Sequence, residues 1–311
     1  MKQYLIILLT LAFSLSAHGR RYDEVVESGY IRIAVYRDFP PYSFRSTAPQ
    51  AGRPAGIDIE VGKRIARRLG VRPQWFWLTA DENLEDDLRN AVWKGHYLGG
   101  GVADVMLRVP YSADFSRQTD ESGELKNDKV IIFGPYHRER WTVLRDTAQL
   151  PKLSNLAPFR YHKVGVEVDS VPDLTLTSVF GSRLADNVIH YRTLPDAVDA
   201  LRRGEVAAVA GMRGQIEWRL HQPGGNQAPG ERHKFQISDA SITQWHRREW
   251  DIGAAVKRSY RTLGNALERE MEKLIESGEM ASIFAQYKMS YELPGSYLSR
   301  QQALHSLPLT Q

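Results

Sequence analysis

Three aromatic residues follow the first short β-rich run of the chain and could contact a ligand. Phe39, Tyr42 and Phe44 come after residues 31–35, with two consecutive prolines between the first and the second. Aromatic faces at the end of a strand can stack on a ligand or attract a cation. The alternative is that the prolines fix a turn and that one or two of these rings pack in the core. We retain Phe39, which we favour, and Tyr42 as candidate ligand-binding residues.

Two arginines near the end of a later apolar run could bind an anionic group. Arg108 lies in the run at residues 102–109, Tyr111 follows it, and Arg117 lies in the polar stretch at residues 112–128. A guanidinium group binds a carboxylate or phosphate through two parallel hydrogen bonds. Either arginine could supply this group, and exposure on the surface is the alternative for each. All three side chains are therefore candidate ligand-binding residues.

The sequence offers no set of residues with the spacing of a catalytic or metal site. Its nine histidines are scattered, and His162, His190 and His246 share no ligand spacing. The chain has no cysteine, which excludes thiolate ligands and disulfide bonds. Asp86 and Asp87 are adjacent on an expected helix and cannot both face one substrate. We therefore expect a binding protein without enzymatic activity, cofactor or metal.

Alternating strand and helix patterns must position these side chains. The first amphipathic helix ends at Gly70, which suits a helix C-terminus, and Thr193 can cap a later helix. The expected strands and helices are, in chain order, residues 31–35, 58–69, 72–78, 84–93, 102–109, 163–168, 193–204, 206–210, 251–256, 262–275 and 280–287. This alternation indicates two α/β units, whose ligands bind beyond the carboxyl ends of the strands.

Residues 1–19 have the layout of a cleavable signal peptide. Lys2 precedes an apolar run at residues 4–15, and cleavage is expected after Ala17 or Gly19. The run is too short to cross a bilayer, which takes about 20 residues. The net charge is only +4, and the basic residues form no stripe with interleaved aromatics of the kind that binds nucleic acid. We therefore expect a periplasmic protein with a small-molecule ligand.

Several short segments, taken in order, carry a resemblance to a known family. They are residues 31–44 (IRIAVYRDFPPYSF), 56–70 (GIDIEVGKRIARRLG), 103–105 (ADV), 133–136 (FGPY), 164–168 (VGVEV), 197–209 and 252–257 (IGAAVK). Their order and spacing are similar to those of the extracellular solute-binding proteins of family 3, which serve ABC importers of polar amino acids. The resemblance covers about residues 30–288.

The resemblance implies an α/β, two-lobed periplasmic-binding-protein fold of type II, in which the chain crosses twice between the lobes at a hinge. Lobe 1 would comprise residues 25–138 and 247–290, and lobe 2 residues 139–246. Residues 291–311 would form a polar C-terminal tail. Hinge closure around a ligand is the mechanism that such a fold provides. The implied partner is the membrane permease of an ABC importer, and we expect a monomer.

The resemblance also bears on the ligand. Arg117 lies near the position of the family's carboxylate-binding arginine, and Ser170 follows a lobe 2 strand where the family offers a hydroxyl. Asp58 belongs to the family's glycine–aspartate motif, but we interpret it as an N-terminal helix cap and not as a ligand contact. The acid that binds the α-amino group is missing near residues 211–212, and Ala207 replaces an aspartate. We therefore predict a small polar or anionic solute and not a standard amino acid.

A second resemblance leaves another function open. Residues 87–90 (DLRN) and 104–110 (DVMLRVP) are similar to the periplasmic MoxJ/XoxJ-type branch of the same fold, which accompanies quinoprotein alcohol dehydrogenases. This resemblance is short. It implies, as the alternative, an accessory protein that docks on a periplasmic dehydrogenase and transports nothing.

Overall fold

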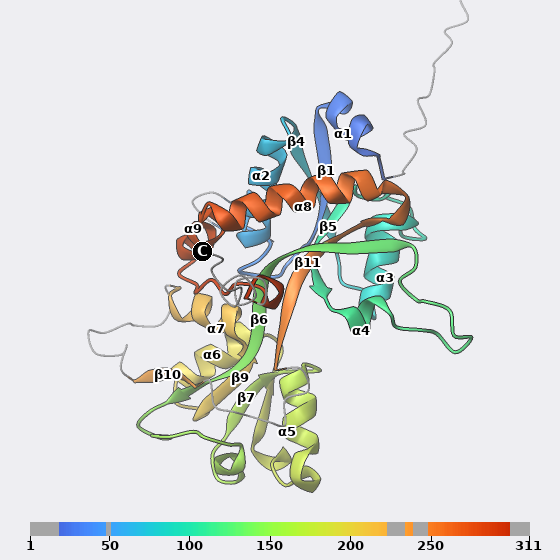
Figure 1. Cartoon of the computed structure of the whole chain (residues 1–311). Coiled ribbons are helices and arrows are strands. Elements are labelled where there is room, and N and C mark those ends of the chain that lie inside the picture. The colour runs from blue at the N-terminus through green and yellow to red at the C-terminus, as the bar shows by residue number, and fades with distance from the viewer. Residues whose placement is uncertain (1–18, 48–50, 223–233, 239–247, 299–311) are drawn as a thin grey trace, which may run out of the picture.

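The computed structural model describes residues 19–47, 51–222, 234–238 and 248–298 (Figure 1). The expected signal peptide lies outside these residues except for Gly19. Most of residues 221–234, whose Pro, Gly and polar residues predict a loop, also lie outside them. Within the described part of the chain, the helices are all too short or too polar to cross a membrane.

The first part of the chain follows the predicted alternation closely. Its elements are α1 (Tyr22–Ser28), β1 (Tyr30–Tyr36), β2 (Phe44–Arg45), β3 (Pro54–Ala55), α2 (Ile57–Arg68), β4 (Arg72–Leu78), α3 (Leu84–Leu88), the π-turn η1 (Arg89–Trp93), β5 (Val105–Tyr111) and α4 (Ala113–Ser116). The predicted helix at residues 84–93 is therefore present, but its second half is wound more loosely than an α-helix.

The remainder contains several elements that the sequence patterns did not indicate. It comprises β6 (Val130–Asp146), η2 (Ala157–Arg160), β7 (Val164–Glu167), α5 (Val171–Ser182), η3 (Ala185–Asn187), β8 (Val188–Tyr191), α6 (Leu194–Arg202), β9 (Ala208–Met212), α7 (Arg213–Leu220), β10 (Phe235–Ser238), β11 (Glu249–Lys257), η5 (Arg258–Tyr260), α8 (Arg261–Glu276) and α9 (Glu279–Gln286). Of these, β6, α5, α7, β8 and β10 were not predicted as strands or helices.

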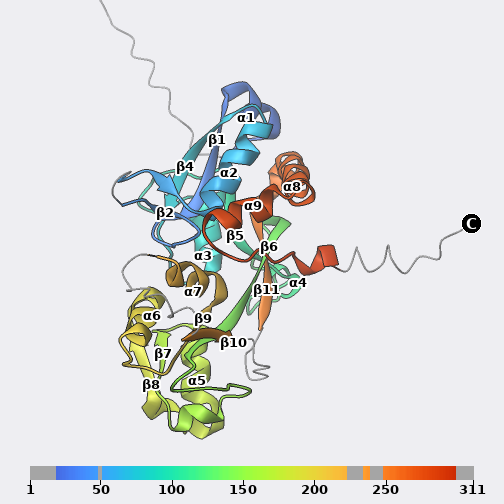
Figure 2. The ribbon, with the colours of Figure 1, turned by 90° about the vertical axis from the view of Figure 1, so that its left-hand side faces the viewer.

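Most of the described strands form one path with the order β4-β1-β5-β11-β6-β9-β7-β8, while β10 pairs with β6 beside it and β2 and β3 form a separate small sheet. Strand β1 is parallel to β4 and β5, and β7 is parallel to β8 and β9. The long strand β6 pairs with β11 through residues 130–140 and with β9 through residues 141–145, antiparallel in both cases. Both views show β6 running from one body of the molecule into the other (Figures 1 and 2).

The buried side chains fall into separate groups on the two sides of this crossing. Two hydrophobic clusters join residues of β1, α2, β5 and η1 with residues of β11, α8 and α9. Two others are built from the end of β6 together with residues of β7, α6 and β9. We call the first body lobe 1 and the second lobe 2. Each lobe thus buries its own apolar surface, as two domains joined by strands must do.

The start of α2 corrects one prediction. The N-cap is Gly56 and not Asp58, and the cap has no side-chain hydrogen bond. A side chain at Gly56, where φ is +121°, would collide with the backbone of Tyr42, so only glycine fits there. Asp58 lies inside the first turn, and its carboxylate points to Arg108. By contrast, the predicted cap at Thr193 is present, since its side chain accepts a hydrogen bond from the Asp196 amide.

Candidate functional site

A cavity of about 650 Å³ lies where the two lobes meet. Its lining includes residues 36–39 and 78–81, at the carboxyl ends of the parallel strands β1 and β4, which is where α/β sheets bind ligands. Its described lining residues are Tyr36, Arg37, Asp38, Phe39, Leu78, Thr79, Ala80, Asp81, Asn83, Leu84, Asp87, Arg108, Pro110, Glu139, Met212, Trp250 and Ile252. Most come from lobe 1, whereas Met212 ends a lobe 2 strand, and Glu139 and Trp250 belong to the strands that join the lobes.

Two of the six predicted site residues line this cavity. They are Phe39 and Arg108. Tyr42 is fully buried behind them. Tyr111 and Arg117 are exposed and are not among the residues that line the cavity. Whether any of these side chains contacts a ligand stays a prediction.

Ser170, the sixth predicted residue, has a structural role that the sequence did not indicate. It is the N-cap of α5, where its hydroxyl accepts a hydrogen bond from the Asp173 amide at 3.3 Å. Capping of this kind satisfies an otherwise unpaired amide at the start of a helix. Ser170 is not among the residues that line the cavity.

Arg108 forms a buried ion pair at the wall of the cavity. Its Nε lies 2.6 Å from Asp58 Oδ2, and its Nη2 lies 3.2 Å from Oδ1, the geometry of a two-point contact. Burial is the largest single influence on the pKa of Arg108 and lowers it, but Asp58, Tyr136 and Tyr42 together outweigh burial and raise the pKa of the guanidinium. The Tyr136 hydroxyl donates to Asp58 at 2.9 Å, and Arg108 itself has a positive φ of 61°. The arginine is therefore held firmly by its own protein.

Tyr42 joins this ion pair to the crossing strand β6. The Arg108 guanidinium lies 3.4 Å from the centre of the Tyr42 ring, a cation–π contact. The Tyr42 hydroxyl donates to Glu139, which also lines the cavity. His137 lies 3.6 Å from the same carboxylate. Burial above all raises the pKa of Tyr42, so the hydroxyl remains a donor.

Three carboxyl groups follow the ends of β1 and β4. Asp38 comes two residues after β1, Asp81 three residues after β4, and Asp87 lies on α3. Asp87 accepts hydrogen bonds from the Tyr36 hydroxyl at 2.7 Å and from the Asp81 amide at 2.8 Å. Burial raises the pKa of Asp87. These acids were not among the predicted ligand contacts, although the position of Asp38 and Asp81 just after strands was a usable signal.

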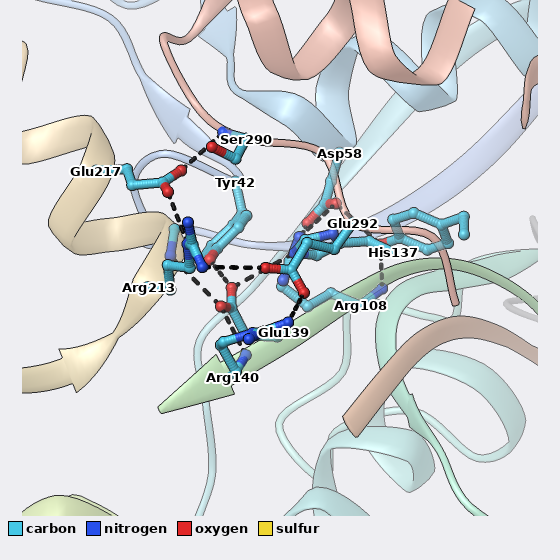
Figure 3. Close-up of polar contacts among 12 residues, drawn as sticks. Tyr42, Asp58, Arg108, His137, Glu139, Arg140, Arg213, Glu217, Ser290 and Glu292 are labelled. Carbon is cyan, nitrogen blue, oxygen red and sulfur yellow. Dashed lines mark hydrogen bonds and ion pairs between the residues drawn. The ribbon is translucent and has the colours of Figure 1, made fainter. Parts of the chain in front are cut away.

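A polar cluster on the other side of Tyr42 ties α7 of lobe 2 to the C-terminal segment (Figure 3). Arg213 pairs with Glu217 at 2.7 Å and with Glu292 at 3.4 Å. Glu217 accepts a hydrogen bond from the Ser290 amide at 2.7 Å. The amide of Gly214 donates to Glu139 at 3.4 Å. These contacts hold the start of α7 against lobe 1.

The chemistry of the lining suits binding. Aromatic rings, aliphatic side chains and a few fixed polar groups are the usual composition of a small-molecule pocket. In the described residues, His, Asp and Glu nowhere gather in a group of three that could hold a metal ion.

Comparison with known proteins identifies the type of fold and the related family. The model of the bacterial extracellular solute-binding proteins, family 3, matches residues 31–92. A curated relative, cyclohexadienyl dehydratase of Pseudomonas aeruginosa, is 36% identical over 64 residues. That match covers 21% of this chain and only 23% of the dehydratase. The predicted resemblance to family 3 is therefore confirmed, with its sequence support concentrated in lobe 1.

Solved structures match far more of the chain. An ancestral cationic amino acid solute-binding protein superimposes with a TM-score of 0.65 at 16% identity, covering 86% of this chain and 98% of its own. An amino acid ABC transporter substrate-binding protein from Streptococcus pneumoniae, bound to L-arginine, has a TM-score of 0.59 at 16% identity and covers 88% and 99%. The predicted α/β, two-lobed periplasmic-binding-protein fold of type II is thus confirmed. At these identities the likeness establishes the fold alone.

Proposed function

We propose that this relative of the family 3 solute-binding proteins is exported to the periplasm, captures a small polar solute between its lobes and delivers it to an ABC importer. The proposal includes the predicted signal peptide at residues 1–19 and the predicted lobe boundaries near residues 138 and 247. It is supported by the fold, by the family match and by the transporter proteins among the similar structures.

The observation that carries the proposal is the cavity between the lobes. Its volume of about 650 Å³ lies within the roughly 300–1,000 Å³ of ligand pockets. Asp81 and Asp87 line it from lobe 1, Met212 from lobe 2, and Trp250 from a strand that joins them. A solute there touches both lobes, so it favours the closed form over the open one by its extra contacts.

We further propose that the chain binds its solute without converting it. The dehydratase relative makes turnover of a cyclohexadienyl compound the specific alternative to exclude. Two acids of this cavity accept hydrogen bonds from their own protein, Asp87 from Tyr36 and Glu139 from Tyr42. Groups that are fixed in this way serve to orient a ligand.

Binding, closure and turnover can be tested on one preparation. The mature chain is purified and screened against amino acids, amines and organic acids by thermal unfolding, because a bound ligand stabilises the folded state by mass action. A hit is titrated by calorimetry, and small-angle X-ray scattering with and without it measures closure. A bound solute that decreases the radius of gyration supports the proposal. Failure of every solute class at millimolar concentration contradicts it, and so does release of product from a cyclohexadienyl substrate.

Export is tested separately. The full chain with a C-terminal tag is expressed in a Gram-negative host, and the periplasmic fraction is analysed by mass spectrometry. We expect a mature N-terminus just after Ala17 or Gly19. An intact N-terminus in the cytoplasmic fraction contradicts this part of the proposal.

A further inference from the structure

Acidic side chains outnumber basic ones around the cavity. In the described lining, the acids are Asp38, Asp81, Asp87 and Glu139, and the bases are Arg37 and Arg108. Charges of one sign in a cleft with apolar walls produce a focused potential. The charge that a solute experiences therefore depends on which of these groups are already neutralised by the protein.

Arg108 is neutralised by its own partner. Asp58 occupies two of its nitrogens, Nε and Nη2, and both side chains are almost completely buried, at 5% and 1% exposure. A carboxylate from a solute would have to compete with this fixed pair for the guanidinium. The residue that seemed best suited to bind an anion is thus engaged within the protein.

Arg37 offers little compensation because it is exposed to solvent. An exposed cation is screened by water and salt and attracts an anion only weakly. Arg117, the other predicted anion-binding residue, is also exposed and is absent from the lining. Among the described lining residues, Arg37 is therefore the one cation that is not already paired with Asp58, and it attracts a solute carboxylate only weakly.

The three carboxylates beyond β1 and β4 retain capacity for a solute. The oxygens of an ionised carboxylate have about four acceptor positions. Asp87 uses two of them, for the Tyr36 hydroxyl and the Asp81 amide, and Asp81 accepts from the Asn90 side chain at 2.9 Å. Asp38 is exposed on the loop after β1. Ammonium or guanidinium hydrogens could fill the remaining positions.

Aromatic rings adjoin these acids. Tyr36 and Phe39 both line the cavity and pack edge to face, with ring centres 5.9 Å apart. Trp250 lines it from β11 and packs against Trp141 at 4.7 Å. Aromatic faces attract organic cations and also bury an apolar body. Carboxylates beside fixed rings are the chemistry that recognises an amine attached to an apolar skeleton.

We infer that the cavity selects a small organic cation, an amine or guanidinium compound with an apolar body, over an anion of the same skeleton. This inference rests on the proposed function and narrows its solute class. It also departs from the sequence-based prediction, which allowed an anionic solute because either Arg108 or Arg117 could supply a guanidinium group.

Matched probes test the inference by calorimetry on the purified mature chain. 2-Phenylethylamine, L-phenylalanine and 3-phenylpropionate share one skeleton and differ in charge, and agmatine and L-arginine form a second set. We expect the amine to bind at least about tenfold more tightly than the acid, because the acid cannot donate one or two charge-assisted hydrogen bonds. Each amine should also bind more tightly than its matched amino acid, because the acids of the lining repel the carboxylate that the amino acid adds.

The outcomes separate this inference from the proposed function. If 3-phenylpropionate or another acid binds as tightly as its matched amine, the cleft still captures a solute, but the inference is wrong. If every probe and every solute of the broader screen fails to bind, the proposed function fails and the inference fails with it. Binding of the amines alone supports both.

Two variants test whether the carboxylates that line the cavity cause its preference for organic cations. Asp38→Asn removes an exposed carboxylate of the cavity, so the fold is not at risk, and we expect about two- to fivefold weaker binding of agmatine because water screens an exposed charge. Asp186→Asn makes the same chemical change on an exposed residue of η3, outside the cavity, and should leave binding unchanged. A double variant combines Asp38→Asn with Asp81→Asn. The inference is overturned if the single variant and the double variant both bind amines as tightly as the wild type does.

Discussion

Arg108 and Asp58 meet at the boundary between the cavity and the core of lobe 1, with Nε 2.6 Å from Oδ2. Two segments that are 50 residues apart in the chain are thereby joined, β5 and the first turn of α2. The pair explains why a positively charged side chain can line a ligand pocket and still contribute little positive potential to it. It also fixes the Tyr42 ring, on which the guanidinium lies.

Removal of one member of this pair should be costly. Arg108→Met leaves the Asp58 carboxylate buried without its counter-charge, and we expect a loss of about 3–5 kcal/mol in the free energy of unfolding. Urea titration measures this loss. The double variant with Asp58→Leu removes both charges and should lose less than the sum of the single variants. Arg117→Met, at an exposed position, is the control and should change stability by about 0.5 kcal/mol at most. An Arg108 variant as stable as this control would contradict the account.

Asp87 predicts a pH dependence of stability. Burial raises the pKa of this group in the folded state above its ordinary value of 3.8. The folded protein therefore holds a proton that the unfolded chain has already released, so stability falls as pH rises from about 3.8 through the raised pKa. Asp87→Asn cannot ionise and lacks this contribution. As pH rises across that interval, the unfolding free energy of the wild type should decrease relative to that of the variant. A difference that is constant with pH would show that Asp87 titrates normally.

The alternation of strands and helices was predictable because each element has one buried face. The apolar spacing of α2 and α8 follows the helical period, and the Thr193 cap gives a local start signal. By contrast, β6 carries a polar stretch at residues 137–140 between apolar ends. Two of its polar side chains bind distant partners, Arg138 to Asp251 and Arg140 to Glu292. A strand that passes between two bodies has no single buried face, so periodicity could not indicate it.

The sequence predicted two residues that line the cavity but not the balance of charge around it. Phe39 and Arg108 were named because ligands bind near strand ends, and both line the cavity. The pairing of Arg108 with Asp58 depends on tertiary contact over 50 residues, which a sequence pattern does not encode. Once Asp58 was interpreted as a helix cap, Arg108 seemed to be available for an anion. The acids at positions 38 and 81 also follow strand ends and would have changed the expected solute.

Gly214 lets α7 of lobe 2 approach lobe 1. A Cβ atom there would collide with the Tyr42 hydroxyl and the end of Met289, and it would lie 3.1 Å from a Glu139 oxygen. Tyr42 is fully buried and has little room to move. We expect Gly214→Ala to shift the equilibrium towards an open form, with a larger radius of gyration in X-ray scattering and weaker solute binding. A variant that keeps the wild-type radius of gyration and affinity would show that this contact is not needed for closure.

Glu292 should contribute to closure through charge. It contacts Arg213 of α7 at 3.4 Å and also pairs with Arg140 of β6 (Figure 3). The carboxylate is 20% exposed, so salt screens these contacts only in part. We expect Glu292→Ala to speed solute dissociation about two- to fivefold in dilute buffer, equivalent to roughly 0.5–1 kcal/mol, and less in 1 M NaCl. Stopped-flow displacement measures the rate.

Glu205→Ala is the control, because its partner Arg203 belongs to the same lobe and both are exposed. Equal dissociation rates for the two variants at low salt would show that Glu292 does not hold the lobes together.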